Sequence, residues 1–212
     1  SENFVVVGNA TDADLRRAAT ELEGFQSVLR QEFPAIRLAA PVPTLIVVLS
    51  DNDTFARFQP RDTRGRREEW VGGYFMPLPA VNYMVTGWRG ENGLAFDTVF
   101  HEFTHYLLAR NLPRVPLWLA EGVAEFYSTF RLDTGKNLWL VGETPRLRLP
   151  YLRTHPLLPL ERILRETSTE SFERDQDRQT FYAQSWAFVH YLFLGQRGAR
   201  TRQIGMYLDA LE

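Results

Sequence analysis

Cysteine is absent from this chain of 212 residues, and lysine occurs only once, as Lys136. Without cysteine, the protein has no disulfide bond and none of the thiolate sites that bind structural zinc. The sequence contains no run of 18 apolar residues, so we expect no membrane insertion within this chain. Its net charge of −2 gives no overall attraction to phosphate backbones, and we expect no nucleic acid partner.

The other basic residues are all arginine, which is typical of a GC-rich bacterial genome. The lack of cysteine is compatible with the cytoplasm or a bacterial periplasm, and we favour a periplasmic or secreted location. A hydrophobic content of 44% over this length is enough for a sizeable core. The composition therefore indicates a globular enzyme-sized chain rather than a binding tail.

Residues 101–105 read HEFTH, which is the HExxH pattern. Imidazoles four residues apart on a helix differ by about 40° around its axis, so His101 and His105 can reach the same metal ion. Zinc accepts imidazole ligands, and Glu102 between them is placed to activate a water molecule as a general base. Apolar residues at helical spacing over 96–108 predict a helix whose buried face the two histidines border.

A catalytic zinc site needs a third protein ligand. We expect a second helix over residues 117–127, with Pro116 at its start, and this helix carries Glu121 and Glu125. The two acids are four residues apart on one face, so on residue type alone they compete for the role of third ligand. Gly122 lacks a side chain, and we expect this helix to approach the HExxH helix closely there.

The segment WLAEG at residues 118–122 resembles the W-L-x-E-G of gluzincin metallopeptidases, in their aminopeptidase branch and in the peptidase MA-like domains. The resemblance implies one Zn²⁺ ion per chain, held by His101, His105 and Glu121. It also implies that Glu125 supports a ligand histidine by fixing its tautomer. Fifteen residues separate His105 from Glu121, a gap shorter than in the aminopeptidases that suits the smaller MA-like domains.

Residues 181–186 resemble the Y-x-K-G segment of the aminopeptidase branch, with Gln-Ser in place of the Lys-Gly pair. On this match, Tyr182 is catalytic and donates a hydrogen bond to the oxyanion that forms during peptide hydrolysis. The alternative is that Tyr182 is a core aromatic and that His190, two turns later, lines the cleft. We expect His190 to be a packing residue and His155 to lie in a loop.

Residues 69–75 and 80–86 are predicted to form two strands. Gluzincins bind a peptide by strand addition along an edge strand just before the zinc helix, so the resemblance places the substrate backbone beside Gly72, Gly73 and Tyr74. The two glycines would permit a close approach. The G-x-M-E-N segment that grips a free amino terminus in aminopeptidases is absent, so exopeptidase specificity does not carry over.

Strand patterns lie in the first half of the chain and helical patterns dominate the second. This order predicts an α+β fold, with an N-terminal mixed sheet whose edge strand lies beside the zinc helix and a mainly helical C-terminal subdomain. The resemblance implies a thermolysin-like, gluzincin architecture. We expect a single domain, with a sheet-rich half over 1–90 and a helical half over 91–212, and a further helical-repeat region after it in the full-length protein.

A turn signal at residues 133–136 is typical of a hairpin and predicts strands on both sides of it, as far as Leu149. The other predicted elements are strands over 4–7 and 44–49 and helices over 12–32, 53–58, 160–166, 178–196 and 200–211.

Together, these patterns predict a zinc-dependent peptidase acting on a peptide or protein substrate. The alternative is a catalytically inactive or metal-retaining interaction module of the same fold. That alternative predicts damage to the catalytic set, whereas Glu102, Glu121 and Tyr182 are all present.

Overall fold

The computed structural model describes residues 1–61, 65, 72–87, 94–112, 114–133, 135–136, 138–146 and 148–211. The chain divides into two compact units. The first comprises Ser1–Leu107 with Phe130–Leu140, and the second comprises Leu108–Thr129 with Val141–Glu212.

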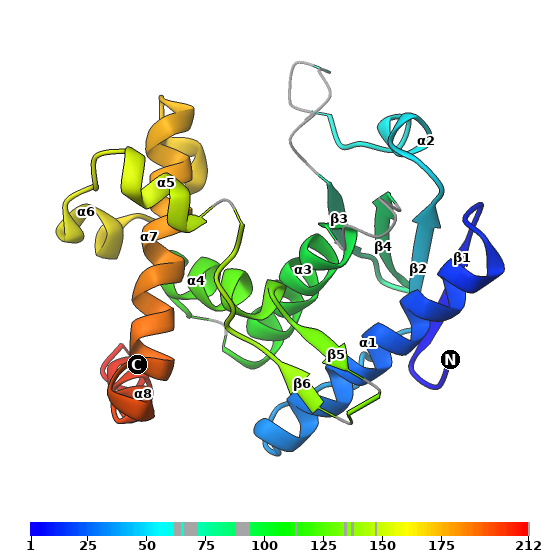
Figure 1. Cartoon of the computed structure of the whole chain (residues 1–212), viewed down its shortest axis with the longest axis horizontal. Coiled ribbons are helices and arrows are strands. Elements are labelled where there is room, and N and C mark those ends of the chain that lie inside the picture. The colour runs from blue at the N-terminus through cyan, green and yellow to red at the C-terminus, as the bar shows by residue number, and fades with distance from the viewer. Residues whose placement is uncertain are drawn as a thin grey trace. The chain divides into compact units, whose positions relative to one another are not determined.

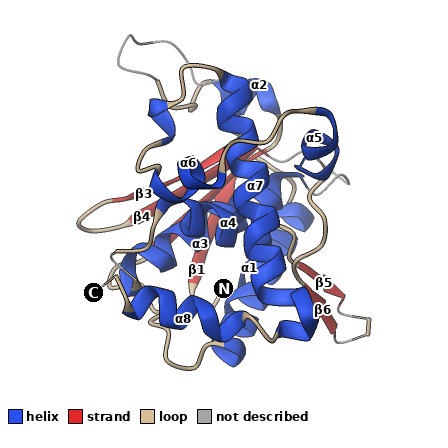
Figure 2. Ribbon diagram, turned by 90° about the vertical axis from the view of Figure 1, so that its left-hand side faces the viewer, coloured by secondary structure: helices blue, strands red, loops and turns tan. Residues whose placement is uncertain are grey.

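A four-stranded mixed sheet forms the centre of the first unit (Figure 1). Its strands are β1 (Phe4–Gly8), β2 (Thr44–Leu49), β3 (Gly73–Pro77) and β4 (Asn82–Gly87). The order in the sheet is β1-β2-β4-β3; β1 and β4 are parallel to β2, whereas β3 is antiparallel to β4 (Figure 2). β3 is thus an outer strand of this sheet.

The helices of the first unit cover this sheet, and they are α1 (Asp12–Glu32), α2 (Asn52–Ala56) and α3 (Leu94–Asn111), the last as far as Leu107. An aromatic core joins α1 to α3, because the Phe25 ring lies 4.6 Å from Phe100 and 5.0 Å from Phe130, centroid to centroid. Ile46 of β2 and Met84 of β4 are buried side by side in register. This packing of aromatic and aliphatic side chains fixes the position of α3, which carries the HExxH pattern.

The hairpin of the first unit consists of β5 (Arg131–Asp133) and β6 (Leu138–Leu140). Its Leu132 side chain fills the space where a Cβ of Gly24 would lie, 2.7 Å from that position. Arg131 also forms a 2.6 Å ion pair with Asp97 of α3. The hairpin therefore contacts both α1 and α3.

The second unit is helical: it contains the rest of α3, followed by α4 (Leu117–Ser128), α5 (Arg148–Thr154), α6 (Leu160–Arg165), α7 (Asp175–Leu194) and α8 (Thr201–Asp209), with 3₁₀ turns at Thr169–Ser171 and Gly195–Gly198. α4 packs along α7. Trp118 of α4 stacks on Phe188 of α7 at 4.8 Å, and the ring of Tyr207 from α8 lies 5.8 Å from the same indole. α7 also contacts α5, α6 and α8, so it is the central helix of this unit.

The α+β class and the mixed sheet are confirmed, and the helix over 12–32 and the strand over 44–49 match the structure residue for residue. The predicted strand as far as Leu149 is wrong, because β6 ends at Leu140 and α5 begins at Arg148. Residues 69–71 of the predicted edge strand lie outside the described residues. In the part of the chain that the structure describes, every helix is too short or too polar to cross a lipid bilayer.

Candidate metal centre

The histidines of the HExxH pattern lie at the border of the buried face of α3. Phe100 and Phe103 are buried, at 1% and 2% exposure, whereas His101, Glu102 and His105 are half-buried. The helical repeat accounts for this placement: the apolar residues form one stripe along α3, and residues 101, 102 and 105 lie at its edge. The predicted helix and its orientation are confirmed.

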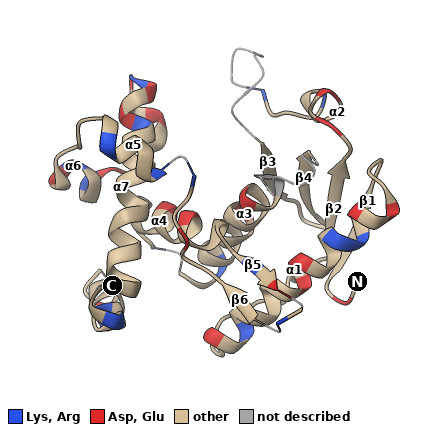
Figure 3. Cartoon of the chain, in the orientation of Figure 1, with Lys and Arg blue, Asp and Glu red and all other residues tan. Residues whose placement is uncertain are grey.

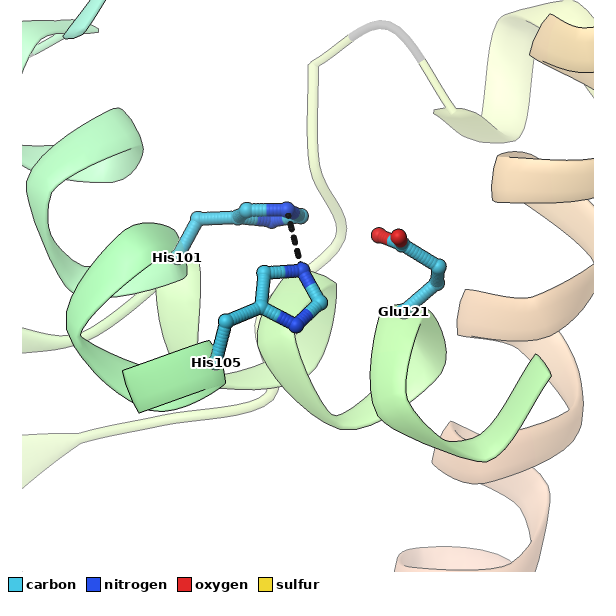
Figure 4. A group of neighbouring side chains, drawn as sticks. All are labelled: His101, His105 and Glu121. Atoms are coloured by element: carbon cyan, nitrogen blue, oxygen red, sulfur yellow. Dashed lines mark hydrogen bonds between the residues drawn. The ribbon is translucent and has the colours of Figure 1, made fainter. Parts of the chain in front are cut away.

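The two imidazoles face each other with their Nε2 atoms 3.1 Å apart (Figure 4). Two zinc–nitrogen bonds at a tetrahedral angle would hold these atoms about 3.3 Å apart, so the pair is close to the spacing that a shared ion requires. One ligand atom each of His101, His105 and Glu121 lies within 4.8 Å of the others. This group could hold a metal ion.

The carboxylate of this group comes from α4, a helix whose charged residues are Glu121 and Glu125 and no others (Figure 3). Both are buried, at 8% and 6% exposure. Burial of an ionised carboxylate is costly unless a positive group or hydrogen bonds compensate it. Two such residues on one face of an otherwise apolar helix are therefore not part of a solvated surface, and each needs a compensating partner.

Glu125 is held by an ion pair with Arg148, the first residue of α5. Arg148 Nε donates to Glu125 Oε2 at 3.0 Å and Nη2 donates to Oε1, so the guanidinium grips both oxygens. Arg148 Nη1 donates to Gln179 Oε1 of α7 at 2.9 Å. Burial alone would lower the pKa of Arg148, but the charge of Glu125 and the hydrogen bond to it raise that pKa overall, so the guanidinium stays charged.

Tyr182 of α7 lies in the same neighbourhood as these acids. The guanidinium carbon of Arg148 is 5.2 Å from the centroid of its ring. Burial and the negative charge of Glu121 raise the pKa of the Tyr182 phenol well above its ordinary value of 10, against the hydrogen bond with Thr169. The hydroxyl is therefore protonated at neutral pH and available as a donor beside Glu121.

Three further residues considered in the sequence analysis, His190, His155 and Gln184, make packing contacts or hydrogen bonds to the main chain. His190 lies among rings, 5.3 Å from Trp186 and 6.2 Å from Phe126 between centroids. His155 follows α5 and stacks on Tyr151 at 3.7 Å, as expected for a loop residue. Gln184, where the aminopeptidase segment has lysine, instead binds the main chain of Leu158, accepting from its N–H at 2.7 Å and donating to its carbonyl at 3.1 Å.

The predicted substrate-binding residues lie at the start of β3. A Cβ on Gly73 would lie 3.1 Å from the Thr98 side chain of α3, so this glycine permits close packing of the strand on the helix. Tyr74 packs against the cluster of Leu49, Phe55 and Val85, and burial raises the pKa of its phenol. Gly72, just before the strand, is half-buried. The peptide-binding role of these three residues stays a prediction.

The predicted close approach at Gly122 exists, but it faces a different helix. The three atoms nearest to a Cβ there belong to Ser185 and Val189 of α7, at 2.4–2.8 Å, whereas we expected the close approach to be with α3. The helical repeat shows that a small residue lies on one face of α4, but it does not say which helix packs on that face.

Neither Arg148 nor Gln179 was predicted from the sequence to lie near Glu121 and Glu125. Arg148 is 23 residues from Glu125, in a segment that carries no recognisable motif. One signal could have pointed to such a partner. Glu125 lies one turn after Glu121 in an apolar helix, and a buried carboxylate is usually paired with a cation.

The model of the family described as "Protein of unknown function (DUF1570)" matches residues 95–207, which include α4, α5, α7 and all of α3 except its first residue, and therefore His101, His105 and Glu121. No curated protein matches the chain.

Proposed function

This chain belongs to the DUF1570 family, and we propose that it is a zinc-dependent metallopeptidase of the gluzincin, peptidase MA-like type. The observation that carries the proposal is the group formed by His101, His105 and Glu121, with ligand atoms within 4.8 Å of one another. Two imidazoles and a carboxylate are the donor set that hydrolytic zinc sites use, with a position left open for water or substrate. Structural zinc sites rely mainly on cysteine, which this chain lacks.

A bound zinc ion would supply Lewis acidity and lower the pKa of a coordinated water. Glu102, next to His101 on α3, takes the proton from the attacking water and passes it to the departing amine. The Tyr182 hydroxyl, kept protonated by burial, donates a hydrogen bond to the oxygen on which negative charge develops.

The substrate we propose is a peptide or protein, bound in extended form along β3. Two features support this: β3 is an outer strand of its sheet, and it packs on α3, with the rings of Phe75 and Tyr106 4.5 Å apart. A peptide added to this edge would run beside the helix that carries Glu102. We propose a thermolysin-like architecture on the same grounds, because a sheet edge precedes the HExxH helix in the chain.

The test is to replace Glu102 with glutamine in protein loaded with zinc. Glu102→Gln removes the proton acceptor and keeps the size of the side chain, so zinc content should stay at one ion per chain while hydrolysis of a mixed peptide library falls to background. Glu173→Gln, at an exposed position outside the group, is the control and should change neither value. Full activity of the Glu102→Gln variant would rule out this mechanism.

The same experiment separates the alternative function. Wild-type protein that holds zinc yet cleaves no member of the library would favour the metal-retaining interaction module. Wild-type protein that binds no zinc while folded would exclude the metal centre itself.

A further inference from the structure

Two carboxylates on α4 are candidates for one ligand position. Glu121 and Glu125 are one turn apart, about 6 Å along the helix axis, and both are buried on the same side. Both also act electrostatically on Tyr182, so they share one local environment. Helix geometry alone does not decide which of them binds an ion.

Arg148 distinguishes between the two. Its Nε and Nη2 donate to the two oxygens of Glu125, and its remaining Nη1 is fixed by Gln179 at 2.9 Å. The side chain of Arg148 is 19% exposed, so little water surrounds the pair. Moving Glu125 toward an ion would leave a buried guanidinium without its partner, which is strongly unfavourable.

We propose that Arg148 is a positioning residue that selects the metal ligand: by holding both oxygens of Glu125, it keeps that carboxylate out of the coordination sphere and leaves Glu121 as the third ligand. The inference rests on the proposed zinc site. It assigns a role to an ion pair that the peptidase mechanism does not use, and it explains why α4 can bury a second acid beside a cation site without adding a fourth protein ligand.

The decisive experiment asks whether Glu125 can replace Glu121 once it is released. Zinc affinity is measured by competition with a chromophoric chelator, without any assay of activity. Glu121→Ala should weaken zinc binding. The double variant with Arg148→Gln should bind zinc roughly 10–100-fold more tightly than Glu121→Ala alone, which is the range by which groups around a metal site change its affinity. Adding Glu125→Gln to this double variant should abolish the recovery.

The matched control is Arg162→Gln in the Glu121→Ala background. Arg162 also pairs with an acid in the second unit, Asp177 at 3.6 Å, and its loss should restore no zinc affinity. Recovery with Arg162→Gln, or no recovery with Arg148→Gln in a folded protein, overturns the inference.

If the Arg148→Gln variants do not fold, Arg148→Lys in the wild-type background keeps the charge but cannot grip both oxygens at once. With cobalt(II) in place of zinc, this variant should show the weaker visible absorption of a higher coordination number, and Glu125→Gln should return the spectrum to that of the wild type. An unchanged spectrum overturns the inference. Wild-type protein that binds no zinc overturns it together with the proposed function, whereas zinc binding without peptide hydrolysis removes the peptidase mechanism alone.

Discussion

A Cβ atom on Gly122 would lie 2.4 Å from the carbonyl oxygen of Ser185 and 2.5 Å from a methyl group of Val189. The contact joins α4 to the backbone of α7, so neither side can move by a simple change of rotamer. The two helices that carry Glu121 and Tyr182 are thus packed tightly together at the glycine that follows Glu121.

Gly122→Ala should therefore destabilise the protein, by about 1–3 kcal/mol as for other overpacked core positions, and should weaken zinc binding because α4 must shift. The matched control is Gly205→Ala in α8, where a Cβ meets nothing within 4 Å. That change should be neutral or stabilising by up to about 1 kcal/mol, since alanine is the better helix former. Urea unfolding of both variants measures the difference, and equal stabilities would contradict the packing described for α4 and α7.

Zinc should bind once per chain and should raise the stability of the protein. His101→Ala, His105→Ala and Glu121→Ala each remove a ligand, so metal analysis should find little zinc in these variants. In the wild type, free zinc at 100 times its Kd should stabilise the fold by about 2.7 kcal/mol through mass action. His155→Ala, at a histidine stacked on Tyr151, is the control that should keep both the metal and the thermal shift.

Tyr182→Phe tests the oxyanion donor with the loss of a single oxygen atom. Removing one such donor costs about 10²–10³ in kcat, so peptide hydrolysis should slow by that factor while KM and zinc content change little. The ring stays under the Arg148 guanidinium, so the fold should survive. An unchanged kcat would make Tyr182 a core aromatic and would make His190 the next residue to replace.

The free energy of unfolding at acid pH should depend on Asp51, the N-cap residue of α2. Its carboxylate accepts hydrogen bonds from Ser50 Oγ at 2.6 Å and from the Thr54 N–H at 2.7 Å, and these bonds lower the pKa of Asp51 below its ordinary value of 3.8. A carboxylate with a lowered folded-state pKa stabilises the protein above its unfolded pKa, and this contribution disappears as the pH falls through the folded value.

Asp51→Asn retains a capping side chain but cannot ionise. The wild type should be the more stable protein at pH 6, and the difference between the two urea midpoints should shrink steadily from about pH 4 down to pH 2. A difference that is independent of pH would show that the charge of Asp51 contributes nothing.

The structural elements that were predicted well have signals within a few residues of themselves. α1 has the N-cap Thr11, whose hydroxyl accepts from the Asp14 N–H at 3.2 Å, and a continuous helical repeat, so both of its ends were correct. The α5 helix was missed because it is seven residues long, contains no fully buried residue and follows a hairpin signal that suggested longer strands. Parallel pairing of β1, β2 and β4 brings together residues about 40 positions apart. The residue pattern within one strand does not indicate which other strand it pairs with.

The sequence by itself determined the pair His101 and His105, with Glu102 between them, because four residues of one helix suffice to bring the two imidazoles to one point. It also restricted the third ligand to two acids on the next helix. The family resemblance favoured Glu121 of the two, and only the tertiary structure shows that Glu125 is paired with a cation, because Arg148 comes from α5, 23 residues along the chain. Helical periodicity decides which side chains share a face, whereas charge pairing in a buried site depends on which distant segments pack there.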